Sequence, residues 1–175
     1  MLLPAVALLL AACGGTAEPA PGSPAATTSA APATTSATPA PTTAAEPVTT
    51  EQDCPYLDTT TVEDVVGQKT PTVTTTGVPG GPPPSCTFAK PNGEAALTVE
   101  ISQAADSVAA RTAAVERVAG IGGTAVTDIA DGGGIAVGQP TVLAVADGTL
   151  VVVVTINQES SLQAREIAQA VVGAV

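Results

Sequence analysis

Few residues in this chain of 175 can do chemistry. It has three cysteines, Cys13, Cys54 and Cys86, and 16 acidic residues against five basic ones, but no histidine. Histidine is the usual general base and the commonest metal ligand, so most hydrolase and metalloenzyme mechanisms lack their central residue here. The sequence therefore predicts no catalytic residue, no cofactor-binding residue and no metal ligand.

Cys13 follows an apolar run over residues 2–12, which is shorter than the roughly 20 residues that a membrane-spanning helix needs. The run is typical of a secretory signal peptide, predicted over residues 1–12. Its end, Leu10-Ala11-Ala12-Cys13, resembles the lipobox of bacterial lipoproteins. That resemblance implies cleavage before Cys13 and a diacylglyceryl group on its thiol; a buried strand or helix ending in cysteine is the alternative. No basic residue precedes the run, so the true start codon is expected upstream.

We therefore expect an exported protein, anchored to the outer face of the cell membrane through Cys13. Cys54 and Cys86 would then lie in an oxidising compartment, where two thiols in one domain have a single intramolecular pairing. The sequence predicts a disulfide between Cys54 and Cys86. Free reactive thiols or a two-ligand metal site fit less well, because no histidine and no CxxC spacing accompany the two cysteines.

Two glycine-rich patterns could carry chemistry, but each has a plainer structural explanation. Residues 120–125 match the G-x-G-x-x-A string of dinucleotide-binding folds, yet they follow a predicted helix and do not join a strand to a helix. Asp128 and Asp131 precede glycines without the spacing of a calcium-binding loop. A solvated turn is expected there.

Acidic residues gather where the predicted domain begins, at Asp53, Asp58, Glu63 and Asp64. Carboxylates are favoured near a helix N-terminus, so helix capping explains Glu63 and Asp64, and a cation or partner site is the alternative. Paired carboxylates for glycoside hydrolysis stay open, although a sugar cleft normally offers aromatic platforms and the chain has one tyrosine and one phenylalanine. We expect Tyr56 to pack against the disulfide.

Residues 13–53 form the predicted linker, which begins with the lipidated cysteine. After Cys13 it is rich in Ala, Thr and Pro and contains no aromatic or basic residue. Such a segment cannot bury enough apolar area to offset the entropy cost of ordering, so we expect it to be a disordered spacer. The predicted globular domain follows at residues 54–175.

Strands are predicted where β-branched or alternating residues occur. Asn92-Gly93 and Asp147-Gly148 are typical turn pairs, and each predicts a hairpin between the strands that flank it. Residues 150–156 are apolar on both faces, which predicts a central strand. The predicted strands cover residues 71–76, 86–90, 94–102, 125–129, 134–137, 141–146 and 150–156.

Three helices are predicted around these strands. Thr60 and Glu63 match a capping box that opens a short helix ending near Gly67, and Ser160 with Gln163 matches another. The helix predicted over residues 104–119 has one face formed by Val108, Thr112, Val115 and Ala119. The buried stripe of the C-terminal helix is predicted at Ala164, Ile167, Ala168, Val171 and Val175. This order predicts an α+β fold, an antiparallel or mixed sheet with helices packed on one face and one disulfide.

The chain resembles a group of small actinobacterial lipoproteins of the cell envelope. The shared features are the lipobox at Cys13, the linker, Cys54-Pro55-Tyr56-Leu57 before a short helix, and Cys86-Thr87-Phe88 after a Gly/Pro loop. The group is known only as a domain of unknown function, of the DUF2020 type, with the DUF3558 type as the alternative. The resemblance covers about residues 52–175 and implies an envelope location and an α+β domain with one disulfide. It carries no catalytic residues.

We therefore expect a membrane-anchored lipoprotein whose domain is a non-catalytic binding or interaction module in the cell envelope. Its expected partners are the membrane, through lipid on Cys13, and an unknown envelope protein or a small apolar ligand. A carrier of an apolar ligand or lipid is the alternative, and a hydrolase using carboxylates is the third. The net charge of −11 disfavours nucleic acid as a partner, and the domain is expected to be monomeric.

Overall fold

The computed structural model describes residues 45–175, which contain every predicted helix and strand and one additional strand. Cys13 and the predicted signal peptide lie outside the described residues. The strands are β1 (Val48–Glu51), β2 (Thr72–Gly77), β3 (Ser85–Ala89), β4 (Ala95–Gln103), β5 (Thr124–Val126), β6 (Gly133–Ala136), β7 (Thr141–Asp147) and β8 (Leu150–Ile156). The helices are α1 (Thr59–Val66), α2 (Ser107–Ala119) and α3 (Ser161–Val172). Within residues 45–175, no helix has the length and apolar character needed to cross a membrane.

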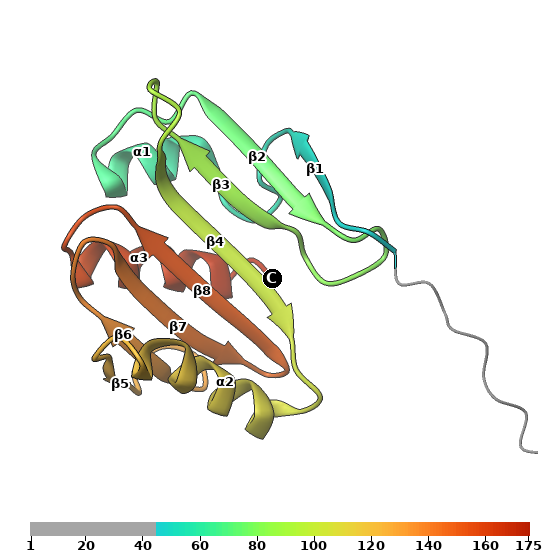
Figure 1. Ribbon diagram of the computed structural model, residues 1–175, viewed down its shortest axis with the longest axis vertical. Helices are drawn as coiled ribbons and strands as arrows, with labels where there is room; N and C mark the ends of the chain where they lie inside the picture. Colours follow the sequence, from blue (N-terminus) through green and yellow to red (C-terminus); the bar gives the residue numbers. More distant parts are fainter. Residues whose placement is uncertain (1–44) are drawn as a thin grey trace, which may run out of the picture. The chain divides into compact units, whose positions relative to one another are not determined.

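The strands form one antiparallel sheet in the order β1-β2-β3-β4-β8-β7-β6-β5 (Figure 1). Its centre is the pairing of β4 with β8, whose register sets Leu97 opposite Ile156 and Val99 opposite Val154. The two predicted hairpins join β3 to β4 and β7 to β8, and Gly93 and Gly148 in their turns have positive φ angles of 84° and 57°. The α+β class and the antiparallel form of the sheet are confirmed.

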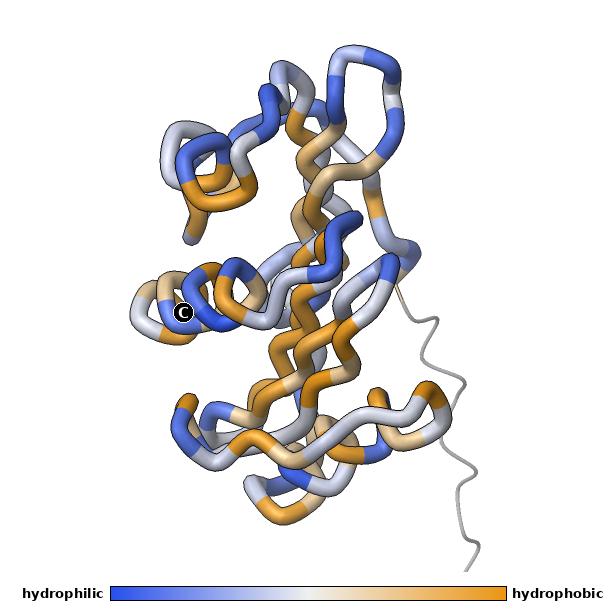
Figure 2. The backbone as a smooth tube through the Cα atoms, turned by 90° about the vertical axis from the view of Figure 1, so that its left-hand side faces the viewer, coloured by the Kyte–Doolittle hydropathy of each residue, from blue (hydrophilic) through white to orange (hydrophobic). Residues whose placement is uncertain are grey.

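Helices cover both faces of this sheet. In β8, Val152 and Val154 lie in the core cluster shared with α1 and α3, whereas Val151 and Val153 lie in a second cluster shared with α2. Figure 1 shows α2 in front of the sheet and α3 behind it, and Figure 2 shows hydrophobic residues along the central strands. The expectation that helices share one face therefore holds for α1 and α3, whereas α2 packs on the opposite face. The cause is β8 itself, because a strand that is apolar on both faces needs cover on both.

The buried face of α2 differs from the face that periodicity selected. Val108 on the predicted face is 75% exposed, and the buried residues are Ala110, Ala114 and Val118. Small side chains allow this helix to lie close to the sheet. The helix lies close to Gly134 of β6, where an added Cβ would overlap the side chain of Val118.

The helix starts follow two different capping patterns. The N-cap of α1 is Asp58 and not Thr60, since the Asp58 carboxylate accepts hydrogen bonds from the Thr60 and Thr61 N–H groups at 2.8 and 3.0 Å. The predicted cap of α3 is confirmed, with Ser160 Oγ accepting from the Gln163 N–H at 3.3 Å. The buried stripe of α3 is confirmed at Ala164, Ile167, Ala168 and Val171, whereas the terminal valine is 38% exposed.

The additional strand, β1, lies within the segment predicted to be disordered linker. It pairs antiparallel with β2, from Val48 opposite Gly77 to Glu51 opposite Thr74. The folded part of the chain therefore begins before Cys54. The prediction was wrong for residues 48–51 because this short β-branched run lies in Ala- and Pro-rich surroundings and becomes a strand only by pairing with β2.

Candidate functional site

The predicted disulfide between Cys54 and Cys86 is present, with the two Cα atoms 5.8 Å apart. Cys54 follows β1 and Cys86 lies in β3, so the bond ties the segment before α1 to the sheet. Between the two cysteines, the chain forms α1, β2 and residues 78–84, which we call the proline loop. The disulfide therefore fixes the start of β3, where the proline loop returns to the sheet.

Tyr56 adds a second restraint on the proline loop. Its side chain lies in the same buried cluster as both cysteines, which confirms the expectation that it packs beside the disulfide. Its phenol O–H donates a hydrogen bond to the carbonyl oxygen of Pro84 at 2.8 Å. Burial raises the pKa of Tyr56 above its usual value, so the phenol keeps this proton. The entry to the loop is close-packed as well, because an added Cβ on Gly77 would lie 2.9 Å from Cβ of Pro84.

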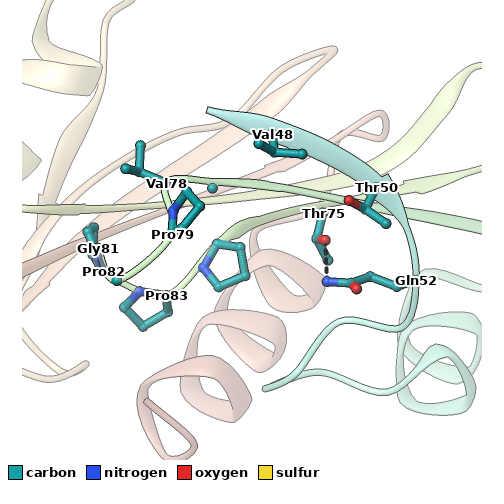
Figure 3. A pocket seen from close by; sticks show the side chains of 12 residues that line it. Val48, Thr50, Gln52, Thr75, Val78, Pro79, Gly81, Pro82 and Pro83 are labelled. Carbon is teal, nitrogen blue, oxygen red and sulfur yellow. Dashed lines mark hydrogen bonds between the residues drawn. The ribbon is translucent and has the colours of Figure 1, made fainter. Parts of the chain in front are cut away.

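A groove of about 500 Å³ lies between the proline loop and strands β1 and β2 (Figure 3). Within residues 45–175 no charged residue lines it, although the chain has a net charge of −11. The lining consists of the whole proline loop together with Val48, Thr50, Gln52, Thr75 and Gly77. We call this the proline groove.

The proline groove combines an apolar rim with a polar floor. Val48 is 56% exposed and Val78 is 36% exposed, so both present apolar surface to solvent at the rim. On the floor, Gln52 Nε2 donates a hydrogen bond to the hydroxyl oxygen of the buried Thr75 at 2.7 Å (Figure 3). The Gln52 carbonyl oxygen and the Thr50 hydroxyl can still form hydrogen bonds with a ligand. This arrangement suits the binding of an uncharged group that has both apolar and hydrogen-bonding parts.

Two of the clustered acidic residues have structural partners. Asp58 caps α1, and hydrogen bonds from Thr61 hold the pKa of its carboxyl below the usual range. Glu63 accepts a hydrogen bond from Lys69 Nζ at 2.6 Å and from the Thr70 N–H at 2.9 Å, and the bond from Lys69 is the main cause of its lowered pKa. In residues 45–175 no group of three or more side chains is arranged to hold a metal ion. Helix capping and an ion pair account for these two carboxylates.

The two glycine-rich patterns also have structural explanations. Asp128 forms an ion pair with Arg165, whose Nη1 lies 2.7 and 2.6 Å from its two carboxylate oxygens, and this lowers the pKa of Asp128. Asp131 Oδ2 accepts a hydrogen bond from the Gly148 N–H at 2.9 Å. Residues 120–125 lead from α2 into β5, so no helix N-terminus follows them to bind a phosphate.

The sequence did not predict the proline groove, because part of its lining, Val48 and Thr50, belongs to β1. The disulfide and the packing of Tyr56 beside it were predicted, and the structure links Tyr56 to the proline loop through its hydrogen bond to Pro84. Two sequence segments point to the groove: a short β-branched run before β2 and a loop with four prolines after it. Only the pairing of β1 with β2 shows that these segments form one groove.

Comparison with known proteins gives a family without an assigned activity. No curated protein matches the chain. A family model described as Domain of unknown function (DUF2020) matches residues 34–175, which include the disulfide, the proline groove and all three helices. The match confirms the first of the two resemblances expected from the sequence. The chain therefore belongs to the DUF2020 family of domains of unknown function.

Proposed function

We propose that this protein is an exported, lipid-anchored lipoprotein whose domain binds a partner in the cell envelope through the proline groove. The observation that carries the proposal is an uncharged groove held in shape by a disulfide and by the Tyr56 hydrogen bond. The proposed action is binding without catalysis. Within residues 45–175 the groove is lined by prolines, glycines, threonines, valines and one glutamine, none of which is a usual general base.

The rigidity of the groove supports a role in binding. Each proline in the loop has a fixed φ angle, and the disulfide restrains the segment that contains the loop. A surface that is already ordered loses little conformational entropy when a partner binds, so modest contacts can give useful affinity. The lack of charged side chains along the groove disfavours charged partners, because a charged segment would lose its hydration in the groove without gaining an ion pair.

The proposed anchor rests on the sequence around Cys13, and it has its own test. The Cys13→Ala variant should move from the membrane fraction to the soluble fraction, since the thiol is the proposed site of lipid attachment. Cys13→Ser serves as a second variant without a thiol and should behave in the same way. Retention of both variants in the membrane fraction would refute the anchor without affecting the proposed role of the groove.

The proposed role of the groove is tested by chemical crosslinking in intact cells, followed by mass spectrometry of proteins and lipids that remain attached. Val48→Lys places a charge at the rim of the groove. Val137→Lys is the matched control, because Val137 is 52% exposed against 56% for Val48 and does not line the groove. We expect one protein adduct that is lost in the Val48 variant and kept in the control. An adduct pattern that is the same in both variants contradicts the proposal.

The second candidate is a carrier of an apolar ligand or lipid in the same groove. The four prolines of the loop favour this alternative, because with Val48 and Val78 they form an apolar wall. The same experiment separates the two functions. A stoichiometric lipid bound to the purified wild-type domain, and displaced by the Val48→Lys substitution, would replace the partner-binding proposal with the carrier.

A further inference from the structure

A second groove contains the only basic side chain within residues 45–175 that has no ion pair. The other four basic residues each contact a carboxylate at 2.6 to 2.7 Å, in the pairs Lys69–Glu63, Lys90–Glu94, Arg117–Glu100 and Arg165–Asp128. Arg111, on α2, has no such contact. Acidic residues outnumber basic ones by 16 to five, so an arginine without a carboxylate partner is unusual in this chain.

Arg111 lies in a groove of about 400 Å³ between α2 and residues 125–133. This segment runs from the end of β5, through the connecting turn, to the first residue of β6. We call it the α2 groove. Val115 lies one helical turn after Arg111 and shares the same wall. It is 44% exposed, so the wall has an apolar part next to the guanidinium. The opposite wall includes the small residues Ala125 and Ala130.

The two carboxylates of this connecting segment are bound elsewhere. Both oxygens of Asp128 contact Arg165 of α3. Asp131 lines the groove, but its Oδ2 accepts the Gly148 N–H at 2.9 Å. Arg111 is therefore left with its hydrogen-bond donors available, while the second oxygen of Asp131 can accept one hydrogen bond from a ligand.

The wall opposite Arg111 has a fixed and unusual backbone. Ala130 has a φ of 46°, and within residues 45–175 it is the only residue other than glycine with a positive φ. The Asp131 N–H donates to the Ala146 carbonyl oxygen at 2.9 Å, and the Gly132 N–H donates to the Ile129 carbonyl oxygen at 2.9 Å. These bonds hold the wall in a conformation that is disfavoured for alanine, as is common at binding sites.

We infer that the α2 groove binds the C-terminal carboxylate of a peptide that ends in small apolar residues. A guanidinium matches a carboxylate with two parallel hydrogen bonds, and Arg111 can supply both. The second oxygen of Asp131 offers an acceptor for the last peptide N–H, a contact that a phosphate or another ligand without donors cannot make. The methyl groups of Val115, Ala125 and Ala130 suit a small terminal side chain. This inference uses another surface than the proline groove and does not depend on the function proposed above.

The test is a chemical-shift titration of the ¹⁵N-labelled full chain with N-acetyl-Ala-Ala. The free-carboxylate form should give saturable shifts at Arg111, Val115 and residues 125–133. The C-terminal amide form should bind about tenfold more weakly, because it loses the charge-assisted hydrogen bonds. Amide signals far from the groove report whether each variant is folded.

Three variants test the role of the guanidinium. Arg111→Gln should weaken binding about tenfold, and Arg111→Lys should restore part of the loss because it keeps the charge without the planar pair of donors. Arg117→Gln is the control on the same helix, because Arg117 is paired with Glu100, and it should leave binding unchanged. The inference is overturned by an absence of saturable shifts at millimolar peptide, by equal binding of acid and amide, or by an Arg111→Gln variant that binds like the wild type.

Discussion

Reduction of the Cys54–Cys86 disulfide should lower the free energy of unfolding by about 3.7 kcal/mol at 25 °C. The two cysteines are 32 positions apart, so the bond closes a large loop. In the chain-entropy model a loop of about 33 residues removes about 12.5 cal/mol/K from the unfolded chain, which gives this energy at 25 °C. The loss is a large part of the roughly 5 to 15 kcal/mol typical of a folded domain.

The assay is urea denaturation followed by far-ultraviolet circular dichroism, with oxidised and reduced protein compared. The Cys13→Ala background leaves only the two disulfide cysteines, and the Cys54→Ala/Cys86→Ala double variant is a second form without the bond. Both forms should show a lower midpoint and a somewhat steeper slope, because the unfolded chain exposes more surface without the crosslink. A loss below about 1 kcal/mol would contradict this prediction, since it would mean that the unfolded chain is already restrained without the disulfide.

Four further predictions concern packing and pH. Tyr56→Phe should lower the free energy of unfolding in urea by about 1 kcal/mol, because the hydrogen bond to the proline loop is lost. Burial raises the pKa of Tyr56 in the folded state, so the stability gained from its neutral phenol is present below about pH 10 and is lost as the pH rises above that value. Tyrosinate absorbance of this single tyrosine should therefore appear only when the protein unfolds. Ionisation of the phenol in the folded protein near pH 10 would contradict this. Gly133→Ala should lower the free energy of unfolding by about 3 kcal/mol or more in urea denaturation, because the added Cβ would overlap a carbonyl oxygen of β7. Gly138→Ala is the control and should change it by less than about 0.5 kcal/mol, because the nearest atom to its added Cβ lies at 3.6 Å. In the same urea denaturation, Ala114→Leu should lower the free energy of unfolding by about 1 to 3 kcal/mol, and Val108→Ser by less than about 0.5 kcal/mol. The reverse order would show that the buried face of α2 is wrongly assigned.

The elements that the sequence predicted well depend on local chemistry. Asn92-Gly93 and Asp147-Gly148 form the expected hairpin turns because glycine adopts positive φ at little cost. The continuous apolar run of β8 correctly indicated a central strand. The disulfide pairing followed from having two cysteines in the predicted domain. Each of these inferences needs only a short segment or a single pairing.

The buried face of α2 could not be read from periodicity. Its sequence offers two stripes, a valine-containing one with Val108 and Val115 and an alanine-containing one with Ala110 and Ala114. A hydrophobicity argument selects the valines, but the structure buries the alanines because the helix lies close to glycines and alanines of β6 and β7. The decisive information is the size of residues on a distant part of the chain.

Both grooves depend on pairings between distant segments, which explains why the sequence did not predict them. The proline groove needs β1 to pair with β2, and β1 has no buried residue to mark it as a strand. The α2 groove needs Asp128 and Asp131 to be engaged by Arg165 and Gly148, so that Arg111 is left without a carboxylate. Charge counts and motif spacing do not contain these partner choices.

The most direct test of the proposed binding role is site-specific photo-crosslinking in intact cells, with a photoreactive residue at Val78 in the proline groove. Leu162 of α3 is the control position, since it is 73% exposed and does not line the groove. We expect a discrete protein adduct from position 78 that is absent from position 162. Equal labelling from both positions, or a lipid adduct alone at position 78, would contradict it.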